Sequence, residues 1–252
     1  MLCIIFSKED EASINISKFI LRSRKWREEK GLLISEDFLL YFIDDLHIYH
    51  DNIDKEIEEK GYRVDTIIFA SRHSSSQNKK TLSVHAIGNF GNAEYGGKNG
   101  EIIKCNPFLM LNAIKTLKEK NLESYEVCYE ATHHGPYLEK PSFFIEIGST
   151  RKEWNDEKAC QAVAEAILEF SEAKEEAFSA IGIGGGHYAP RFSEIAIEKN
   201  VAFGHIAPKY VKINDEILFK MKDATPHCRK VYLHGRIEGI EEKIKKMGLE
   251  IG

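Results

Sequence analysis

The chain has 252 residues, 42% of them hydrophobic and 30% charged, and its 40 acidic and 35 basic side chains give a net charge of −5. This balance is typical of a folded globular protein and excludes a disordered or fibrous chain. The odd number of cysteines, five, excludes a complete disulfide framework and favours a reduced, intracellular protein. No apolar run reaches the ~18 residues of a membrane span. The mild negative charge argues against binding nucleic acid by bulk electrostatics.

Short apolar runs typical of strands alternate with segments typical of helices. The predicted strands are Leu2–Phe6, Phe38–Ile43, Thr66–Ala70, Leu82–Ile87, Val127–Ala131, Phe143–Ile147, Phe178–Ile183, Val201–Ile206 and Val231–Leu233. Ser7 with Asp10 is a candidate cap for a first helix. A helix near Asp51–Lys60 is expected to end at Gly61, because glycine commonly follows the last turn of a helix.

Two later helices carry clearer start signals. Asn106 followed by Pro107 indicates a helix start, and Thr150 with Glu153 forms a capping box. Strands that are apolar nearly throughout and alternate with helices indicate a largely parallel sheet covered on both faces. We therefore expect one α/β domain over residues 1–252, with a mostly parallel or mixed sheet between helices.

Six segments concentrate histidine, glycine and acidic residues, mostly where a predicted strand ends. Ligands of open α/β sheets bind beyond the carboxyl ends of strands, so these segments are expected to meet at one edge. In the first segment, Arg72 would bind an anion and His73 would serve acid–base chemistry or a metal, unless both are solvated side chains of a Ser-rich turn. In the second, His85 is either a site residue or a core histidine, and a loop with four glycines follows it.

The third and fourth segments add a histidine pair and a carboxylate. Neighbouring residues of an extended chain point to opposite faces, so at most one of His133 and His134 is expected to serve a given site. Glu146 interrupts the apolar strand Phe143–Ile147. A buried carboxylate is costly, so Glu146 is expected to bind a metal, pair with a cation or act as a general base, unless it is solvated on an edge strand.

Glycine and histidine recur in the last two segments. Three glycines precede His187, and backbone amides at such a turn can hold an anion or an oxyanion. His205 stands near the end of a strand and is followed by Lys209. Histidines and carboxylates from separate strand ends can build a zinc site with an open position for water. The residues alone indicate a hydrolase-like polar edge, with or without a metal, and no particular substrate.

Six stretches, taken together, resemble the archaeal and plant type of D-aminoacyl-tRNA deacylase. They are FASRHSSS, HAIGNFGNAEYGG, CYEATHHGP, PSFFIEIGS, IGIGGGHYAP and AFGHIAPKY, in this order. The resemblance implies hydrolysis of the ester between a D-amino acid and the 3′ end of tRNA. It also implies an α/β fold related to peptidyl-tRNA hydrolase and the phosphorylases, a zinc requirement and a cytoplasmic location.

The residues and the resemblance together give the candidate site. The candidate catalytic residues are His73, His133, His134, Glu146 and His187, and the candidate zinc ligands are His85, His134, Glu146, His187 and His205. The candidate substrate-binding residues are Arg72, Ser74, Phe90, Tyr95, Gly184, Gly185, Gly186 and Lys209. Phe90 and Tyr95 either line a pocket that refuses the L side chain or simply pack. A local positive surface is expected to include Lys79, Lys80, Lys98 and Lys209.

Other functions fit the same residues. A zinc peptidase or amidohydrolase would act on peptides without tRNA, and a peptidyl-tRNA hydrolase-like enzyme would require an N-blocked aminoacyl group. A binding module would hold a small anion at Gly184–Gly186 without turnover. The predicted partner is D-aminoacyl-tRNA, with no DNA and no membrane, and the chain is expected to be a monomer.

Overall fold

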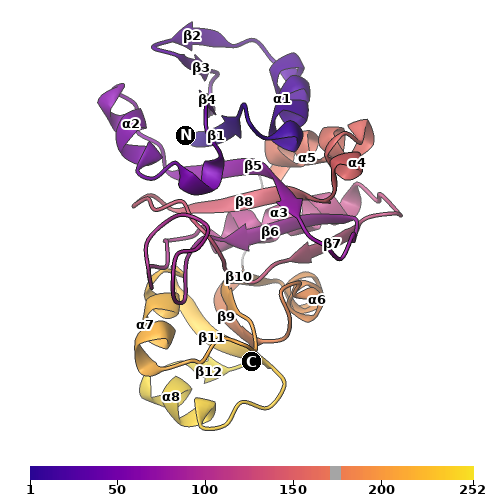
Figure 1. The fold of residues 1–252 in the computed structure, drawn as a ribbon. Helices are drawn as coiled ribbons and strands as arrows, with labels where there is room; N and C mark the ends of the chain where they lie inside the picture. Colours follow the sequence, from indigo (N-terminus) through magenta and orange to yellow (C-terminus); the bar gives the residue numbers. More distant parts are fainter. Residues whose placement is uncertain (171–176) are drawn as a thin grey trace.

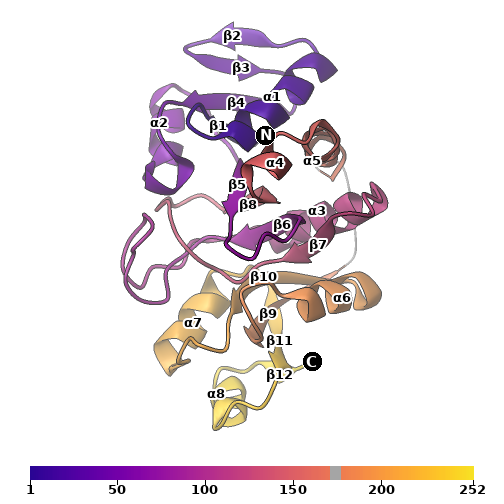
Figure 2. The same cartoon turned by 45° about the vertical axis from the view of Figure 1, so that its right-hand side comes forward.

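Two β-sheets form the framework of residues 1–170 and 177–252, the part of the chain that the computed structural model describes. The larger sheet has the strand order β2-β3-β4-β1-β5-β8-β6-β7, and the smaller one has the order β10-β9-β11-β12. Figure 1 and Figure 2 show the larger sheet running from β2 at the top to β7, with the smaller sheet below it. The predicted α/β class is confirmed. The expectation of one sheet is wrong, because apolar runs identify strands without showing which strands pair.

The larger sheet is mixed. Its strands are β1 (Leu2–Ser7), β2 (Arg27–Glu29), β3 (Leu32–Ile34), β4 (Phe38–Ile43), β5 (Thr66–Ser74), β6 (Thr81–Ala86), β7 (Glu126–Tyr129) and β8 (Ser142–Ser149). β1 runs parallel to β4 and β5, and β5 runs parallel to β8. β6 runs antiparallel to β8 and parallel to β7. The edge ribbon of β2 and β3 was not predicted, because strands of three residues are too short to show an alternating pattern.

Alternation along β5 gives the larger sheet two distinct faces. Ile68 and Ala70 enter one apolar core, whereas Ile67 and Phe69 enter another on the opposite side. The first core is covered by α1 (Glu11–Ser23), α3 (Pro107–Glu119) and α5 (Glu157–Phe170), and α4 (Arg151–Trp154) packs between α1 and β8. The second core is covered by α2 (Ile53–Glu59) and the short 3₁₀ helix η1 (His47–Tyr49). The polar residues that continue β5 beyond Phe69 on this second face open the candidate site.

The predicted helix starts hold with one change. The Asp10 carboxylate accepts a hydrogen bond from the Ser13 amide and caps α1, whereas the Ser7 hydroxyl donates to the Asp45 carbonyl instead. Asn106 caps α3. Thr150 and Glu153 form both hydrogen bonds of a capping box at the start of α4. Caps of this kind stabilise a helix by about 1 kcal/mol.

The smaller sheet is parallel throughout. Its strands are β9 (Phe178–Gly184), β10 (Val201–Ala207), β11 (Cys228–His234) and β12 (Glu250–Ile251), and its helices are α6 (Pro190–Lys199), α7 (Asp215–Asp223) and α8 (Ile240–Lys246). Phe192 of α6 and Phe203 of β10 belong to the same apolar core as the α3 face of the larger sheet. The other face of the smaller sheet packs against Met221 and Ile244. Among the described residues, no helix has the length and apolar character needed to cross a bilayer.

Candidate active site

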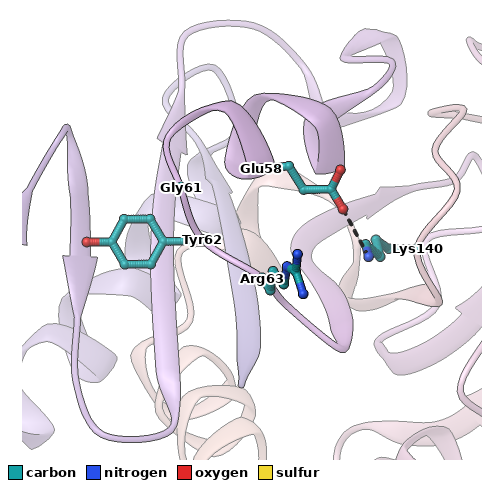
Figure 3. A pocket seen from close by; sticks show the side chains of 5 residues that line it. All are labelled: Glu58, Gly61, Tyr62, Arg63 and Lys140. Carbon is teal, nitrogen blue, oxygen red and sulfur yellow. Dashed lines mark ion pairs between the residues drawn. The ribbon is translucent and has the colours of Figure 1, made fainter.

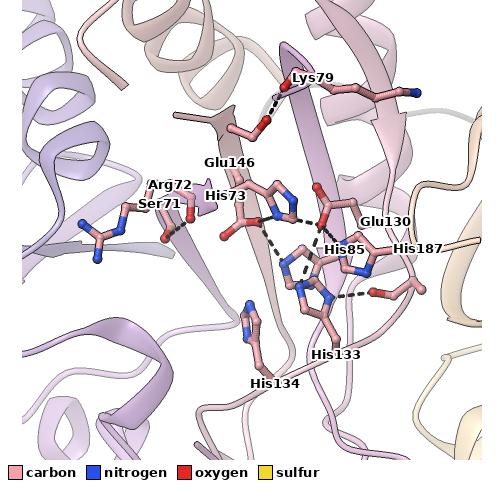
Figure 4. Close-up of polar contacts among 12 residues, drawn as sticks. Ser71, Arg72, His73, Lys79, His85, Glu130, His133, His134, Glu146 and His187 are labelled. Atoms are coloured by element: carbon pink, nitrogen blue, oxygen red, sulfur yellow. Dashed lines mark hydrogen bonds and ion pairs between the residues drawn. The ribbon is translucent and has the colours of Figure 1, made fainter. Parts of the chain in front are cut away.

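Strand register places Glu146 between two histidines on one face of the larger sheet. Glu146 of β8 pairs with Ser71 of β5 on one side and with Ser83 of β6 on the other. Because side chains two residues apart share a face, His73 and His85 lie on the same side as Glu146. Oε2 of Glu146 is 3.5 Å from Nδ1 of His73 and 3.4 Å from Nε2 of His85. Figure 4 shows these side chains converging.

A second carboxylate, Glu130, stands immediately after β7 and is fully buried. Its Oε2 lies 3.1 Å from Nδ1 of His73, 3.0 Å from Nε2 of His187 and 3.8 Å from Nε2 of His133 (Figure 4). Glu130 was not among the site residues predicted from the sequence. The available signal was a carboxylate directly after a buried strand, but the histidines that surround it come from distant parts of the chain.

Both histidines of the adjacent pair reach the site, so the expectation that at most one does is wrong. The ring of His85 lies 4.2 Å from that of His133 and 4.9 Å from that of His134, centroid to centroid. The cause is the backbone at His134, whose φ of +45° is in the left-handed region and breaks the alternation of an extended strand. Nδ1 of His133 donates to the Ala131 carbonyl, and Nδ1 of His134 donates to the Gly135 carbonyl. These hydrogen bonds leave Nε2 of each ring for the site.

Charge is distributed unequally among these buried groups. Burial opposes ionisation of Glu146, but the adjacent ring nitrogens of His73 and His85 outweigh it and lower the pKa of Glu146 to about 2. Burial also opposes ionisation of Glu130, yet the adjacent ring nitrogens of His187 and His73 hold its pKa well below the ordinary value. The same carboxylates overcome the burial of His73 and raise its pKa to about 11.

Burial has the opposite outcome for the histidine pair. It lowers the pKa of His133 well below the ordinary value and that of His134 to about 4, and the neighbouring His85 cation adds to both effects. Neutral imidazoles and ionised carboxylates are the forms that bind metal ions. A metal that recruited His73 would first displace its proton.

The donor set fits a metal such as zinc. In the described part of the chain, buried atoms without a hydrogen-bond partner include both oxygens of Glu130, Oε2 of Glu146, and Nε2 of His73, His85 and His187. The donors of His73, Glu130, His133 and His187 lie within 4.8 Å of one another, as do those of His85, His133 and His134, and of His85, Glu130 and Glu146. Zinc is held by imidazole nitrogen and carboxylate oxygen, and buried polar atoms without partners are costly. A bound cation would satisfy them.

The cluster opens into a pocket of about 570 Å³, a size typical of small-molecule sites. Of the predicted residues it is lined by Arg72, His73, Ser74, Tyr95, His133, His134, Glu146 and His187. The pocket is also lined by residues that were not among the predicted site residues, although Ser71 and Ser75 belong to the first predicted segment: Asp10, Leu46, His47, Ile48, Ser71, Ser75 and Gln77. Leu46, His47 and Ile48 were missed because they come from η1 and its approach, a segment without glycine or charge patterning. The pocket therefore has a His/Glu wall, an apolar wall and a polar wall.

Asp10 fixes the polar wall as well as the first helix. Its Oδ2 accepts hydrogen bonds of 2.9 Å from the Ser71 hydroxyl and from the Arg72 amide. The Arg72 guanidinium lies over the Trp154 ring at 5.1 Å, and Figure 4 shows it directed away from the His/Glu cluster. Arg72 thus stands at the pocket as a cation without entering the cluster.

His205 is not part of the cluster, which corrects its assignment as a zinc ligand. It is fully buried, and its ring nitrogens contact the Ile103 carbonyl and the Thr132 hydroxyl, each at 3.0 Å. Burial lowers the pKa of His205 to about 3. With both nitrogens engaged, His205 positions Thr132, the residue before His133.

Several predicted substrate-binding residues also lie outside the pocket lining. Phe90 packs against the core of the smaller sheet. Gly184 and Gly185 lie against His234, where a Cβ on Gly184 would stand 2.2 Å from the His234 carbonyl oxygen. Gly186 is in the same turn, and the Lys209 amide donates to the Gly185 carbonyl at 2.9 Å. In this structure Gly184 and Gly185 allow the close approach of β9 to His234 of β11, and Gly186 leads into His187.

A second pocket, of about 550 Å³, lies apart from these residues (Figure 3). It is lined by Glu58, Gly61, Tyr62, Arg63 and Lys140, with Glu58 and Lys140 in a 3.0 Å ion pair. It has one carboxylate, which is already paired, and no histidine in its lining. The pocket at the His/Glu cluster is therefore the candidate active site.

Comparison with known proteins identifies the family. The family model of D-aminoacyl-tRNA deacylase matches residues 60–252. The chain belongs to this family. D-aminoacyl-tRNA deacylase of Pyrococcus furiosus is 38% identical over 92% of this chain and 90% of its own length, and that of Picrophilus torridus is 37% identical over 98% and 94%. A crystal structure of a conserved protein of unknown function matches with a TM-score of 0.93 at 32% identity, over 100% of this chain and 94% of that one.

Membership of the D-aminoacyl-tRNA deacylase family confirms the resemblance of the six sequence stretches. Five of these stretches contribute side chains that line the pocket or belong to the His/Glu cluster. The sixth, Ala202–Tyr210, contributes His205, which supports the cluster through Thr132. Family and geometry therefore point to the same part of the molecule.

Proposed function

We propose that this chain hydrolyses the ester of D-aminoacyl-tRNA, releasing the D-amino acid and tRNA, with the help of zinc bound at the His/Glu cluster. Family membership supports the reaction. The observation that carries the zinc proposal is Glu130, a fully buried carboxylate whose Oε2 has ring nitrogens of three histidines within 3.8 Å. Imidazole nitrogens gathered around a carboxylate oxygen are the donor types by which proteins hold zinc.

His73, Glu130, His133 and His187 form the cluster with most donors and would hold the ion. This set differs from the ligands predicted from sequence, of which it retains only His187. Bound zinc lowers the pKa of water and polarises an ester carbonyl. His85 and Glu146 lie outside this set of ligands. Glu146 contacts both His73 and His85, so it would hold the His73 ring in position.

Proton transfer falls to the residues that line the pocket. His134 is neutral, and its hydrogen bond to the Gly135 carbonyl leaves Nε2 to take a proton from an attacking water. The leaving 3′ oxygen of the tRNA must receive a proton. His187 is assigned to the metal, so the proton that His134 has taken from water is the one passed to this oxygen.

The polar wall is proposed to bind the sugar–phosphate end of tRNA. Arg72, Ser74, Ser75 and Gln77 line it and offer a guanidinium, hydroxyls and an amide to phosphate and ribose. Of the expected positive surface, Lys79 lies 5.3 Å from the Tyr188 ring, next to His187, although it is also paired with Glu126. Lower activity at higher ionic strength is expected from such contacts.

We further propose that discrimination between D and L esters is steric. Leu46 and Ile48 give the pocket an apolar part of its lining, against which the side chain of one configuration would pack and that of the other would not. We also propose that the enzyme is a cytoplasmic monomer that acts on tRNA and not on DNA.

Elemental analysis of protein purified without added metal tests the zinc proposal. We expect close to one equivalent of zinc or more, loss of D-tyrosyl-tRNA hydrolysis with a chelator, and recovery when zinc is returned. Fully active protein with a metal content near zero would overturn the role of zinc and leave the substrate assignment standing.

A further inference from the structure

Tyr95 is an aromatic residue that lines the pocket and has no role in the proposed steps of ester hydrolysis. It lines the pocket, yet 62% of its surface is exposed. Its ring therefore stands at the rim, and the His/Glu cluster lies deeper, with Glu130 and Glu146 fully buried. An exposed aromatic ring beside a polar pocket is suited to stacking on a planar ligand.

The backbone that carries Tyr95 is held by three segments. The Tyr95 carbonyl accepts a 3.0 Å hydrogen bond from the Gly135 amide, one residue after His134. The Gly96 carbonyl accepts a 2.9 Å hydrogen bond from the Asn89 amide group. A Cβ on Gly96 would stand 1.6 Å from the Ile48 carbonyl oxygen, so this loop and the η1 segment are in direct backbone contact. Tyr95 is thus exposed at a fixed position and needs little ordering to bind.

The chemistry of the substrate determines which part reaches this rim. In an aminoacyl ester, the amino-acid side chain is attached to the carbon next to the reacting carbonyl and must stay close to it. The nucleobase is separated from the same carbonyl by a whole ribose. With the carbonyl at the buried His/Glu cluster, the amino-acid side chain must stay close to that cluster, and the base reaches farther out, where the exposed Tyr95 ring stands.

We propose that Tyr95 stacks on the terminal nucleobase of the tRNA acceptor end and so positions the ester for hydrolysis. The inference rests on the proposed deacylase function and specifies how its substrate is bound. It replaces both alternatives expected from the sequence, that Tyr95 lines a pocket refusing the L side chain or that it simply packs. Stacking accepts any base plane, so Tyr95 contributes affinity and position rather than recognition of a particular base.

Kinetics of Tyr95→Ala and Tyr95→Phe test the inference. For D-tyrosyl-tRNA, we expect Tyr95→Ala to raise KM about 5- to 150-fold, the range for loss of one base–aromatic stack, with kcat within about twofold. Tyr95→Phe keeps the ring and should remain within about twofold of the wild type. The matched control is Phe219→Ala, which removes a ring that is 56% exposed on α7, outside the pocket lining; its KM should not change.

D-tyrosine ethyl ester separates the base from the amino acid. Because this ester has no base, Tyr95→Ala should leave its hydrolysis unchanged. An equal loss on the ethyl ester would place the amino-acid side chain at Tyr95 and overturn the inference.

Titration with the unacylated trinucleotide CCA, followed by calorimetry, makes the test independent of turnover. We expect Tyr95→Ala to weaken binding by the same factor as it raises KM, whereas equal binding by both proteins would refute stacking. A wild type that binds CCA through Tyr95 but hydrolyses no D-aminoacyl ester would retain the base site and reject the deacylase function.

Discussion

Glu130 and His187 come from different sheets and meet at 3.0 Å between Oε2 and Nε2. Glu130 follows β7 of the larger sheet, and His187 follows β9 of the smaller sheet. Their backbones are also joined, since the Ala131 amide donates to the His187 carbonyl at 2.8 Å and the Ala189 amide donates to the Tyr129 carbonyl at 2.9 Å. The site is therefore assembled where the two sheets meet, and its geometry depends on both.

Replacement of Glu130 tests whether this junction is the centre of the site. Glu130→Gln keeps the size of the side chain but removes its charge, so we expect kcat/KM for D-tyrosyl-tRNA to fall at least about 100-fold and bound zinc to decrease. Glu126→Gln is the control, because Glu126 is in the same stretch but is partly exposed and paired with Lys79. Wild-type zinc content and activity in Glu130→Gln would contradict the account.

Asp10 links the stability of α1 to the polar wall of the pocket. Asp10→Ala removes the helix cap and leaves the Ser71 hydroxyl and the Arg72 amide without their acceptor, so we expect a loss of about 1–3 kcal/mol in unfolding free energy. Asp10→Asn keeps one acceptor oxygen and should lose less. The measurement is urea unfolding, with Glu9→Ala as an exposed neighbouring control. Equal losses for Asp10→Ala and Glu9→Ala would show that these hydrogen bonds contribute nothing.

Alanine substitutions at Gly96 and Gly31 distinguish the cost of a left-handed backbone from the cost of a steric collision. Both have a φ of +75°, but a Cβ on Gly31 would meet no atom within 4 Å, whereas one on Gly96 would collide with the Ile48 carbonyl. Gly31→Ala should therefore lose only the ~1–2 kcal/mol of a left-handed alanine, and Gly96→Ala should lose a further ~1–3 kcal/mol. Calorimetric melting gives both values. Since the Gly96 loop holds Tyr95, the KM for D-tyrosyl-tRNA should rise for Gly96→Ala and stay unchanged for Gly31→Ala. Equal losses of stability in the two variants would disprove the backbone contact at Gly96.

His205 predicts a specific dependence of stability on pH. Burial lowers the pKa of His205 from 6.5 to about 3, so between these values the unfolded chain binds a proton that the folded chain does not. Its contribution to stability is present above pH ~6.5 and falls as the pH falls, by at most ~1.4 kcal/mol per pH unit. His205→Gln does not titrate, so its unfolding free energy should vary less steeply between pH 6.5 and pH 4.5. Equal slopes for the two proteins would contradict the assignment of a neutral, buried His205.

Most strands could be predicted from the sequence because each is a continuous apolar run. The rule that ligands bind beyond the carboxyl ends of strands also pointed to His73, His85 and His187. Contacts between residues that are far apart in the sequence could not be predicted. The pairing of the last strands in a separate sheet depends on strand order, and the central position of Glu130 depends on histidines from β5 and from the turn after β9. His205 was predicted as a zinc ligand because the sequence does not show that its ring nitrogens are occupied. Their partners, Ile103 and Thr132, are remote in sequence. The shared direction of His133 and His134 follows from one backbone angle that the pattern does not encode.

The most direct test compares D-tyrosyl-tRNA with L-tyrosyl-tRNA, using one preparation of known zinc content. The account predicts rapid hydrolysis of the D ester alone, lost on removal of zinc and restored by its return. Equal hydrolysis of both esters would reveal an unselective esterase site and contradict the steric account. Failure of the folded, zinc-loaded protein to hydrolyse the D ester would contradict the proposed function itself.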